Sequence, residues 1–419
     1  MNAPALPAFP DAAATDPERL GWMQGFPPGA DRTVAFADGS AWVFPRTRWA
    51  FSHMRELFPT ANVSRGDGPV ALLPRAERDD LDSVAFTTLD GRPMSWGESL
   101  AANYTDGIVV LHRGVIVCER YFGALQPGRA HSAMSVTKSF VGTLATMLAH
   151  AGALDPASAV TQHLPELKDT AYTGASVRQV MDMTIGVKYS EAYADPDADI
   201  WHYARAGGML PRPPGYDGPA TLYAYLATLR AEGRHGECFA YKTINTEVLA
   251  WIVKRVTGQR LSALTSELIW ARLGAEHDAH YVVDGVGTEA GGGGLNTTLR
   301  DLARFGEAMR QSGWFNGQQI VPEAVVADIR RGADRAQFVR GGYTTLPGWS
   351  YRNMWWVTHD EHGAYTARGI HGQAIWIDPK AEMVIARYGS HPLAANSPHL
   401  DPTSLPAYAA LGRHLLASG

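Results

Sequence analysis

The sequence contains little cysteine and has no long hydrophobic run. Its two cysteines, Cys118 and Cys238, are far apart and form no C-x-x-C pair, so we expect incidental or buried thiols in a cytoplasmic protein. No run of eighteen apolar residues occurs, which predicts that no segment spans a membrane. The amino terminus has no basic residue before Arg19 and no apolar core, so it does not resemble a signal peptide.

Basic residues are also too few and too scattered for a nucleic-acid-binding protein. The net charge is −5, the pI is near 6.3, and no basic block stands out. The 419 residues are 45% apolar and 19% charged, which is a globular composition able to form a large core. We therefore expect a small-molecule ligand rather than a nucleic acid or a membrane, and a homodimer is possible.

Several common catalytic and metal-binding motifs are missing. There is no G-x-S-x-G motif, which argues against an α/β-hydrolase. The glycine run at 291–294 is not followed by Lys-Ser/Thr, so we expect a close-packed loop rather than a phosphate-binding loop. The H-x-x-H pairs at 277–280 and 359–362 lack nearby acidic residues of the zincin type. We predict no metal and no organic cofactor.

The segment MSVTKSF at 134–140 suggests a serine nucleophile with a lysine base. Ser135 and Lys138 are three apart, and apolar residues recur at helical intervals from there to Leu148, with Gly152 as a stop signal. Positions i and i+3 share one face of a helix, so the two side chains can touch. The positive end of the helix also disfavours the charged form of the lysine, and a neutral lysine can act as a base.

The coarse pattern places strands near both ends of the chain and helices in the middle. A hairpin is expected over 105–121 with its turn at 112–114, and two further strands over 373–378 and 382–388. Helices are expected over 176–183, 220–230, 246–256, 262–273, 298–309 and 405–416. The predicted fold class is α+β, with an antiparallel sheet built from N- and C-terminal segments, flanked by helices, and a mostly helical inserted domain.

The corresponding domain boundaries follow from these elements. Residues 1–46 form an irregular extension, 47–133 and 286–419 form the sheet domain, and 134–285 form the helical domain. The active site is predicted in the cleft between the two domains.

A third polar group is needed to move protons, and Tyr241 in FAYKTIN is the candidate. It lies just before a predicted helix, at a boundary where side chains can face a cleft. A tyrosinate, or a tyrosine that shares its proton with Lys138, could accept the serine proton and return it to the leaving group. The position alone favours the alternative of a buried structural tyrosine.

Several longer segments resemble serine hydrolases of the β-lactamase and penicillin-binding-protein fold. The resemblance is specifically to the class C-like, family VIII esterase branch, and within it to the 6-aminohexanoate-dimer hydrolases, which cleave a linear amide. It covers most of the chain from Arg48 onward. The matching segments are RWAFSHMRELFPTANVSR (48–65), MSVTKS (134–139), SVRQVMDM (176–183), KYSEAYADP (188–196), NTEVLAWIVKRVTG (245–258), RDLARFG (300–306) and GIHGQAIWIDP (369–379).

The resemblance implies roles for individual residues. It implies Ser135 as nucleophile, Lys138 as base and Tyr241 as proton relay, with an oxyanion hole formed by the backbone N–H groups of Ser135 and Ile370. His371 stands where penicillin-recognising relatives carry the lysine of Lys-Thr-Gly. The substrate-contacting residues expected on this basis are Tyr193, Ile370, His371, Asn245 and Trp355.

The sequence departs from the family pattern in three places. Thr243 replaces the asparagine of the Tyr-x-Asn signature, although Asn245 follows, and no Lys-Thr-Gly occurs. The loop 201–216 contains no acidic residue that could bind a substrate ammonium group. We therefore predict a serine hydrolase of carboxylic esters or linear amides. A D-amino-acid peptidase or amidase of the same fold, or a silent binding module, are the alternatives.

Overall fold

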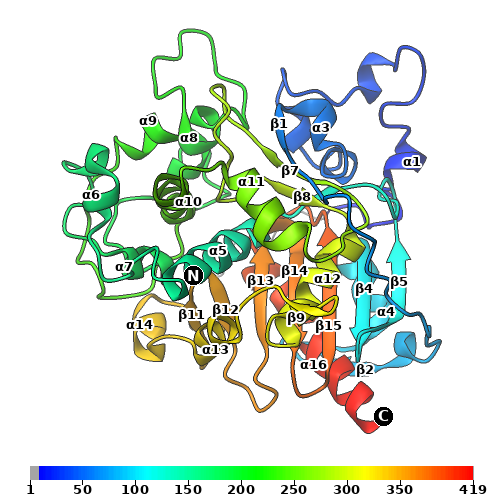
Figure 1. Ribbon diagram of the computed structural model, residues 1–419. Coiled ribbons are helices and arrows are strands. Elements are labelled where there is room, and N and C mark those ends of the chain that lie inside the picture. Colours follow the sequence, from blue (N-terminus) through cyan, green and yellow to red (C-terminus); the bar gives the residue numbers. More distant parts are fainter. Residues whose placement is uncertain (1–8, 419) are drawn as a thin grey trace.

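A seven-stranded antiparallel sheet forms the centre of the molecule (Figure 1). The computed structural model describes residues 9–418. Within this range the strand order is β11-β12-β13-β14-β15-β4-β5. The bounds are β4 Thr105–His112, β5 Val115–Tyr121, β11 Ser350–Arg352, β12 Trp355–Val357, β13 Tyr365–Gly369, β14 Gln373–Asp378 and β15 Met383–Gly389. The sheet thus joins an early hairpin to five strands from the end of the chain.

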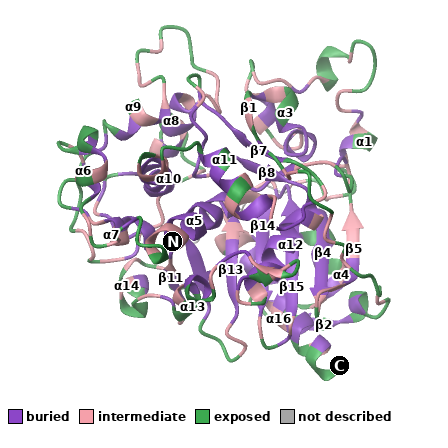
Figure 2. Ribbon diagram, in the orientation of Figure 1, coloured by how far each residue is buried: buried purple, intermediate pink, exposed green. Residues whose placement is uncertain are grey.

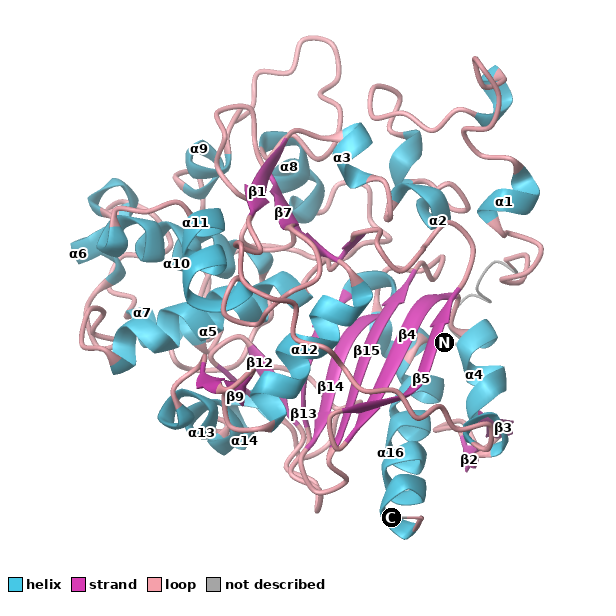
Figure 3. Cartoon of the chain, turned by 45° about the vertical axis from the view of Figure 1, so that its right-hand side comes forward, coloured by secondary structure: helices cyan, strands magenta, loops and turns pink. Residues whose placement is uncertain are grey.

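Helices cover both faces of this sheet (Figure 3). Helix α12 (Leu299–Arg310) packs on β4, β14 and β15, and α5 (Val136–His150) packs on β12, β13 and β14. Helices α4 (Trp96–Ala102) and α16 (Asp401–Ala417) pack on β4 and β15. Because both faces are covered, the central strands are apolar and buried along their length (Figure 2).

A smaller, four-stranded sheet contains β6, the strand that leads to the nucleophile segment. Its order is β1-β7-β8-β6, and every neighbouring pair is antiparallel. The bounds are β1 Thr60–Val63, β6 His131–Ser132, β7 Ala279–Val282 and β8 Leu295–Thr297. The predicted boundary at residue 285 therefore falls between two paired strands, β7 and β8.

The remaining elements are mostly short helices. They are α1 Pro17–Leu20, α2 Thr47–Ala50, α3 Met54–Leu57, α6 Val160–His163, α7 Val177–Met181, α8 Asp199–Ala206, α9 Leu222–Leu226, α10 Thr243–Thr257, α11 Leu261–Thr265, α13 Glu323–Arg331, α14 Arg335–Arg340 and α15 Asn396–His399. Two small hairpins complete the fold, β2 Ala85–Thr87 with β3 Pro93–Ser95, and β9 Trp314–Phe315 with β10 Gln318–Gln319. None of the helices between residues 9 and 418 combines the length and apolar character needed to cross a bilayer.

The predicted fold class is confirmed, and the element boundaries need three corrections. The helix expected over 220–230 is limited to α9, which has five residues and begins after the capping residue Thr221. The helix expected over 262–273 is α11, followed by a π-helical turn at Ser266–Trp270. The C-terminal helix begins at Asp401, four residues earlier than expected, and continues through Pro406.

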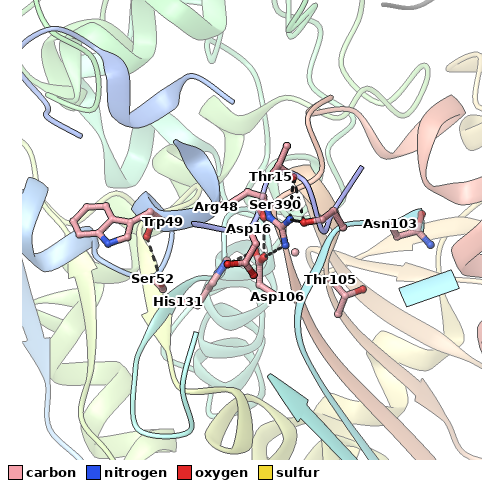
Figure 4. A network of polar contacts seen from close by, with 12 residues as sticks. Thr15, Asp16, Arg48, Trp49, Ser52, Asn103, Thr105, Asp106, His131 and Ser390 are labelled. Carbon is pink, nitrogen blue, oxygen red and sulfur yellow. Dashed lines mark hydrogen bonds and ion pairs between the residues drawn. The ribbon is translucent and has the colours of Figure 1, made fainter. Parts of the chain in front are cut away.

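A buried polar network connects the N-terminal segment to the large sheet (Figure 4). Arg48 forms an ion pair with Asp106 (3.3 Å) and donates to the hydroxyl of Thr15 (3.1 Å). Asp106 also accepts from Ser390 (2.9 Å) and lies 3.3 Å from a ring nitrogen of His131. Burial alone would raise the pKa of Asp106, but its contacts with His131 and Arg48 hold that pKa below the usual value. The described part of the N-terminal extension is therefore anchored to the strand that leads to Ser135.

Candidate active site

Ser135 lies at the start of α5, directly after a strained turn. It is the capping residue of the helix, and Met134 before it has a positive φ of 45°, which is unusual for a residue with a side chain. Thr137 stabilises this turn, because its hydroxyl donates to the Met134 carbonyl (2.6 Å) and accepts from the N–H of Leu295 (3.1 Å). The turn thus holds Ser135 at the junction of β6 and α5.

Lys138 is in contact with the serine, as the spacing predicted. Its Nζ donates to Ser135 Oγ (2.8 Å) and to the carbonyl of Gly292 (2.5 Å), and the side chain is almost fully buried. Burial lowers the pKa of Lys138 to about 8, although Glu191 and Glu247 oppose the shift. A substantial fraction of this lysine can therefore be neutral under mildly alkaline conditions.

The glycine run forms the close-packed loop that the sequence predicted, and Glu247 holds it in place. The Glu247 carboxylate accepts from the N–H groups of Gly291 (3.0 Å) and Gly292 (2.7 Å) and from the hydroxyl of Tyr203 (2.5 Å). A Cβ at Gly292 would lie 2.5 Å from the Thr243 side chain, so only glycine fits. Glu247 thereby positions the carbonyl that binds Lys138.

Tyr241 lies close to both Ser135 and Lys138. Lys138 Nζ is 5.2 Å from the centre of its ring, and the ring stacks on Trp356 at 5.3 Å. Burial and the Glu191 carboxylate raise the pKa of Tyr241 far above its usual value, and a hydrogen bond with Ser135 only partly opposes this. Tyr241 is therefore a protonated phenol rather than a tyrosinate.

A carboxylate that the sequence analysis did not single out completes this cluster. Glu191 accepts from the Tyr193 hydroxyl (3.2 Å) and from the N–H of Thr243 at the start of α10. Burial raises the pKa of Glu191, and Lys138 opposes that rise. The only sequence signal was its position two residues before Tyr193 in KYSEAYADP.

Two cavities meet at Ser135, and both are lined by Ser135, Tyr193 and Ile370. The first, which we call the tryptophan cavity, has a volume of about 90 Å³ and is otherwise lined by Trp42, Met134, Ile200, Trp201, Tyr203, Ala204, Met209, Leu210, Thr243, Gly292 and Gly293. The second, the arginine cavity, has a volume of about 240 Å³ and includes Glu191, Tyr241, Trp356, Arg368 and Asp401. Ser135 is thus accessible from both sides.

Ile370 lies beside the nucleophile in both cavities. Ile370 follows β13 and lines both cavities together with Ser135. In the described part of the chain, neither the Ser135 N–H nor the Ile370 N–H donates a hydrogen bond to a protein acceptor. Both donors are therefore available to an oxygen atom at Ser135.

Three of the residues predicted as substrate contacts are not among those that line the two cavities. Trp355 is fully buried and donates to Thr143 (3.1 Å), whereas Trp356 lines the arginine cavity, since successive residues of a strand face opposite sides. Asn245 is fully buried and accepts from the Tyr172 hydroxyl (2.9 Å). His371 contacts the carbonyl of His391 (2.7 Å), packs against Phe51 at 5.1 Å and lines neither cavity.

Trp42 contributes to the site from the N-terminal extension, where no catalytic contribution was expected. Its indole N–H donates to the Met209 carbonyl (2.6 Å), and its ring contacts Phe51 and Phe58. This contact joins the extension to the loop after α8 and forms one wall of the tryptophan cavity. Among residues 9–418, no three or more His, Cys, Asp or Glu side chains are grouped as ligands for a metal ion.

Comparisons with known proteins agree with this geometry. Residues 101–396 match the β-lactamase family. A curated 6-aminohexanoate-dimer hydrolase from Paenarthrobacter ureafaciens is 37% identical over 385 residues, covering 92% of this chain and 91% of that protein. The chain belongs to the β-lactamase family. The family match and the similarity to 6-aminohexanoate-dimer hydrolases together show that it is a serine hydrolase that acts on amides or esters.

Two solved structures show the same architecture. A Bacillus anthracis protein provisionally named a 6-aminohexanoate-dimer hydrolase superimposes with a TM-score of 0.84 at 32% identity, covering 94% of this chain and 99% of that one. A family VIII carboxylesterase superimposes with a TM-score of 0.54 at 15% identity, covering 82% and 99%. The second similarity concerns the fold alone.

Proposed function

We propose that the protein cleaves carboxylic esters or linear amides through an acyl-enzyme on Ser135. The observation that carries this proposal is the 2.8 Å contact between Ser135 and a buried Lys138 whose pKa is lowered to about 8. Neutral Lys138 accepts the serine proton as Oγ attacks the substrate carbonyl. The N–H groups of Ser135 and Ile370 bind the oxyanion that forms.

The departure of the leaving group, which completes formation of the acyl-enzyme, uses Tyr241. As a protonated phenol beside both Ser135 and Lys138, Tyr241 donates a proton to the leaving group and regains one from Lys138. Water then attacks the acyl-enzyme, and the acid product leaves. Tyr193, which lines both cavities and is bonded to Glu191, orients the scissile amide or ester.

The tryptophan cavity favours a substrate with an uncharged, apolar group on one side of the scissile bond. No charged side chain occurs among the described residues that line the tryptophan cavity. The relatives named as 6-aminohexanoate-dimer hydrolases support a linear amide as one substrate class. An ammonium group buried in the tryptophan cavity would find no carboxylate partner there, and burying it would cost free energy.

Covalent labelling tests the nucleophile. A fluorophosphonate probe should add to the wild-type protein, and peptide mass mapping should locate the adduct on Ser135. Ser135→Ala should abolish both the adduct and nearly all turnover of p-nitrophenyl butyrate. The matched control is Ser139→Ala, one turn further along α5, which should still be labelled. An adduct of undiminished yield on Ser135→Ala would disprove the acyl-enzyme proposal.

A further inference from the structure

A cavity with a volume of about 720 Å³ lies apart from Ser135. It shares no lining residue with the tryptophan or arginine cavity. Its wall comes from α3 and the two residues before it, from Arg65 after β1, from the segment ahead of β6, and from β7 and the three residues before that strand. Arg55, Arg65, Arg129 and His280 are the lining residues that define its chemistry.

The three arginines of this cavity lack carboxylate partners. In residues 9–418, no Asp or Glu oxygen lies within 4.0 Å of their guanidinium nitrogens. Their hydrogen bonds go to neutral groups instead. Arg55 donates to the Asn62 side chain (2.7 Å), Arg65 to the carbonyls of Ala275 (2.7 Å) and Gly68 (2.6 Å), and Arg129 to His53 (2.6 Å). Each guanidinium has five donors, so several remain for a ligand.

Three carboxylates also line this cavity, and one of them, Glu276, is paired with arginines outside it. Glu276 is bound by Arg300 (3.1 Å) and Arg304 (2.6 Å), which do not line the cavity. Asp278 accepts from the Asn62 side chain (2.8 Å) and from the Arg65 N–H (2.8 Å). Glu56 is largely exposed. With Glu276 paired by arginines from outside the cavity, three arginines remain beside two carboxylates, Glu56 and Asp278, which leaves an excess of one positive charge.

His280 provides an independent sign of a missing ligand. Its side chain lines the cavity and is 3% exposed, yet neither ring nitrogen has a hydrogen-bond partner in the described structure. Buried polar groups without partners are rare, because each one costs free energy. Burial and the charge of Arg55 lower the pKa of His280 to about 3, so the ring is neutral and offers one N–H donor.

We propose that this cavity binds a small multivalent oxyanion, in the form of a phosphate group or a polycarboxylate. Arg55, Arg65 and Arg129 supply charge-assisted hydrogen bonds, and His280 supplies a neutral donor. Guanidinium groups suit such ligands because their planar forks pair with two oxygens at once. The site is separate from the acyl-enzyme chemistry, so it can be tested without measuring turnover.

Binding to the wild-type protein is measured by isothermal titration calorimetry and thermal unfolding. Inorganic phosphate and citrate are titrated separately, with potassium chloride at matched ionic strength as the salt control. A ligand that binds only the folded state raises the Tm in a saturable way. We expect saturable binding of at least one of the two anions, and their relative affinities separate a phosphate site from a polycarboxylate site.

Two variants locate the binding in this cavity. Arg55→Gln should weaken the anion affinity roughly tenfold or more, through loss of a charge-assisted bond. His280→Leu should weaken it too, while the ligand-free protein stays at least as stable, because the histidine has no partner to lose. Arg113→Gln is the control for charge, since Arg113 lies in the distant β4–β5 turn, and it should bind like the wild type.

Two results would overturn the proposal. One is the absence of any phosphate or citrate effect beyond that of chloride. The other is unchanged affinity in both Arg55→Gln and His280→Leu when these variants are folded. Strong destabilisation of His280→Leu would show instead that the ring has a purely structural role.

Discussion

At the scale of single residues, opposing effects set the pKa of Lys138. Burial disfavours the ammonium, while Glu191 and Glu247 favour it, and the resulting pKa is about 8. With that pKa, about one tenth of the lysine is neutral at pH 7. Near neutral pH, therefore, only a minority of the free enzyme molecules have the neutral Lys138 that can act as a base.

This balance predicts the pH dependence of turnover. Because the base must be neutral, kcat/KM for p-nitrophenyl butyrate should rise with pH and level off above about pH 8. Lys138→Arg keeps the charge but cannot lose its proton, so activity should fall at least a hundredfold at every pH. The pH–rate profile of both proteins is the measurement. A wild-type profile that is flat from pH 6 to 9 would argue against Lys138 as the base.

Tyr193 should matter more for amides than for esters. Tyr193 lines both cavities, and its hydroxyl donates a hydrogen bond to Glu191. An amine leaves only when it is protonated, whereas p-nitrophenolate leaves without a proton. We expect Tyr193→Phe to lower kcat/KM for a linear amide at least ten times more than for an aryl ester. Tyr216→Phe, on the surface loop, is the control. Equal losses on both substrates would leave Tyr193 with a packing role only.

At the scale of secondary-structure elements, close contact of α5 with the β11–β12 turn fixes the nucleophile helix. A Cβ at Gly142 would lie 2.1 Å from the Asn353 carbonyl oxygen and 2.6 Å from Met354 Cβ. Gly142→Ala should therefore destabilise the protein by about 1–3 kcal/mol, despite the better helix propensity of alanine. Urea unfolding measures this. Gly68→Ala, which would meet no atom within 4 Å, should change stability by far less.

The sequence predicted those elements whose stability is local. The hairpin over 105–121 has a turn in which Arg113 and Gly114 both have positive φ, and α7 has a capping box between Ser176 and Gln179. The strands β1, β6, β7 and β8 were missed, because two to four residues carry no periodicity. Their pairing, for instance of Thr60 with Val282, is a long-range contact.

The same distinction applies to the active site. Ser135 and Lys138 were predictable, because they share one helical turn. Trp42 and Glu191 reach the site only through the tertiary fold, so no spacing rule could identify them. Trp355 was predicted as a substrate contact, whereas its neighbour Trp356 lines the arginine cavity, and β12 was not predicted as a strand. Without the strand, the alternation of its side chains could not be used.

At the scale of the whole molecule, membership of the β-lactamase family does not imply good cleavage of β-lactams. The resemblance to penicillin-recognising proteins implies that His371 stands in place of the lysine in Lys-Thr-Gly, and burial lowers the pKa of His371 to about 4, so the ring is neutral. The ring also packs on Phe51 instead of lining a cavity. A β-lactam carboxylate therefore loses a charge-assisted contact worth about 1.5–3 kcal/mol.

This loss predicts a preference for esters over penicillin-like substrates. We expect kcat/KM for nitrocefin to be at least tenfold below that for p-nitrophenyl butyrate on the same preparation. Ser135→Ala measured in parallel gives the background for both substrates. Nitrocefin turnover equal to ester turnover would show that another group binds the carboxylate.

The strand order of the large sheet also constrains how the chain folds during synthesis. Strand β4 is buried along almost its whole length, and its inner neighbour is β15, which pairs Met383 with His112. The ribosome therefore releases the β4–β5 hairpin long before that neighbour exists. Until β15 emerges, β4 is an unpaired apolar edge, the kind of surface that chaperones bind and that aggregates. Chains terminated before Met383 should consequently accumulate as insoluble material rather than as a smaller folded enzyme.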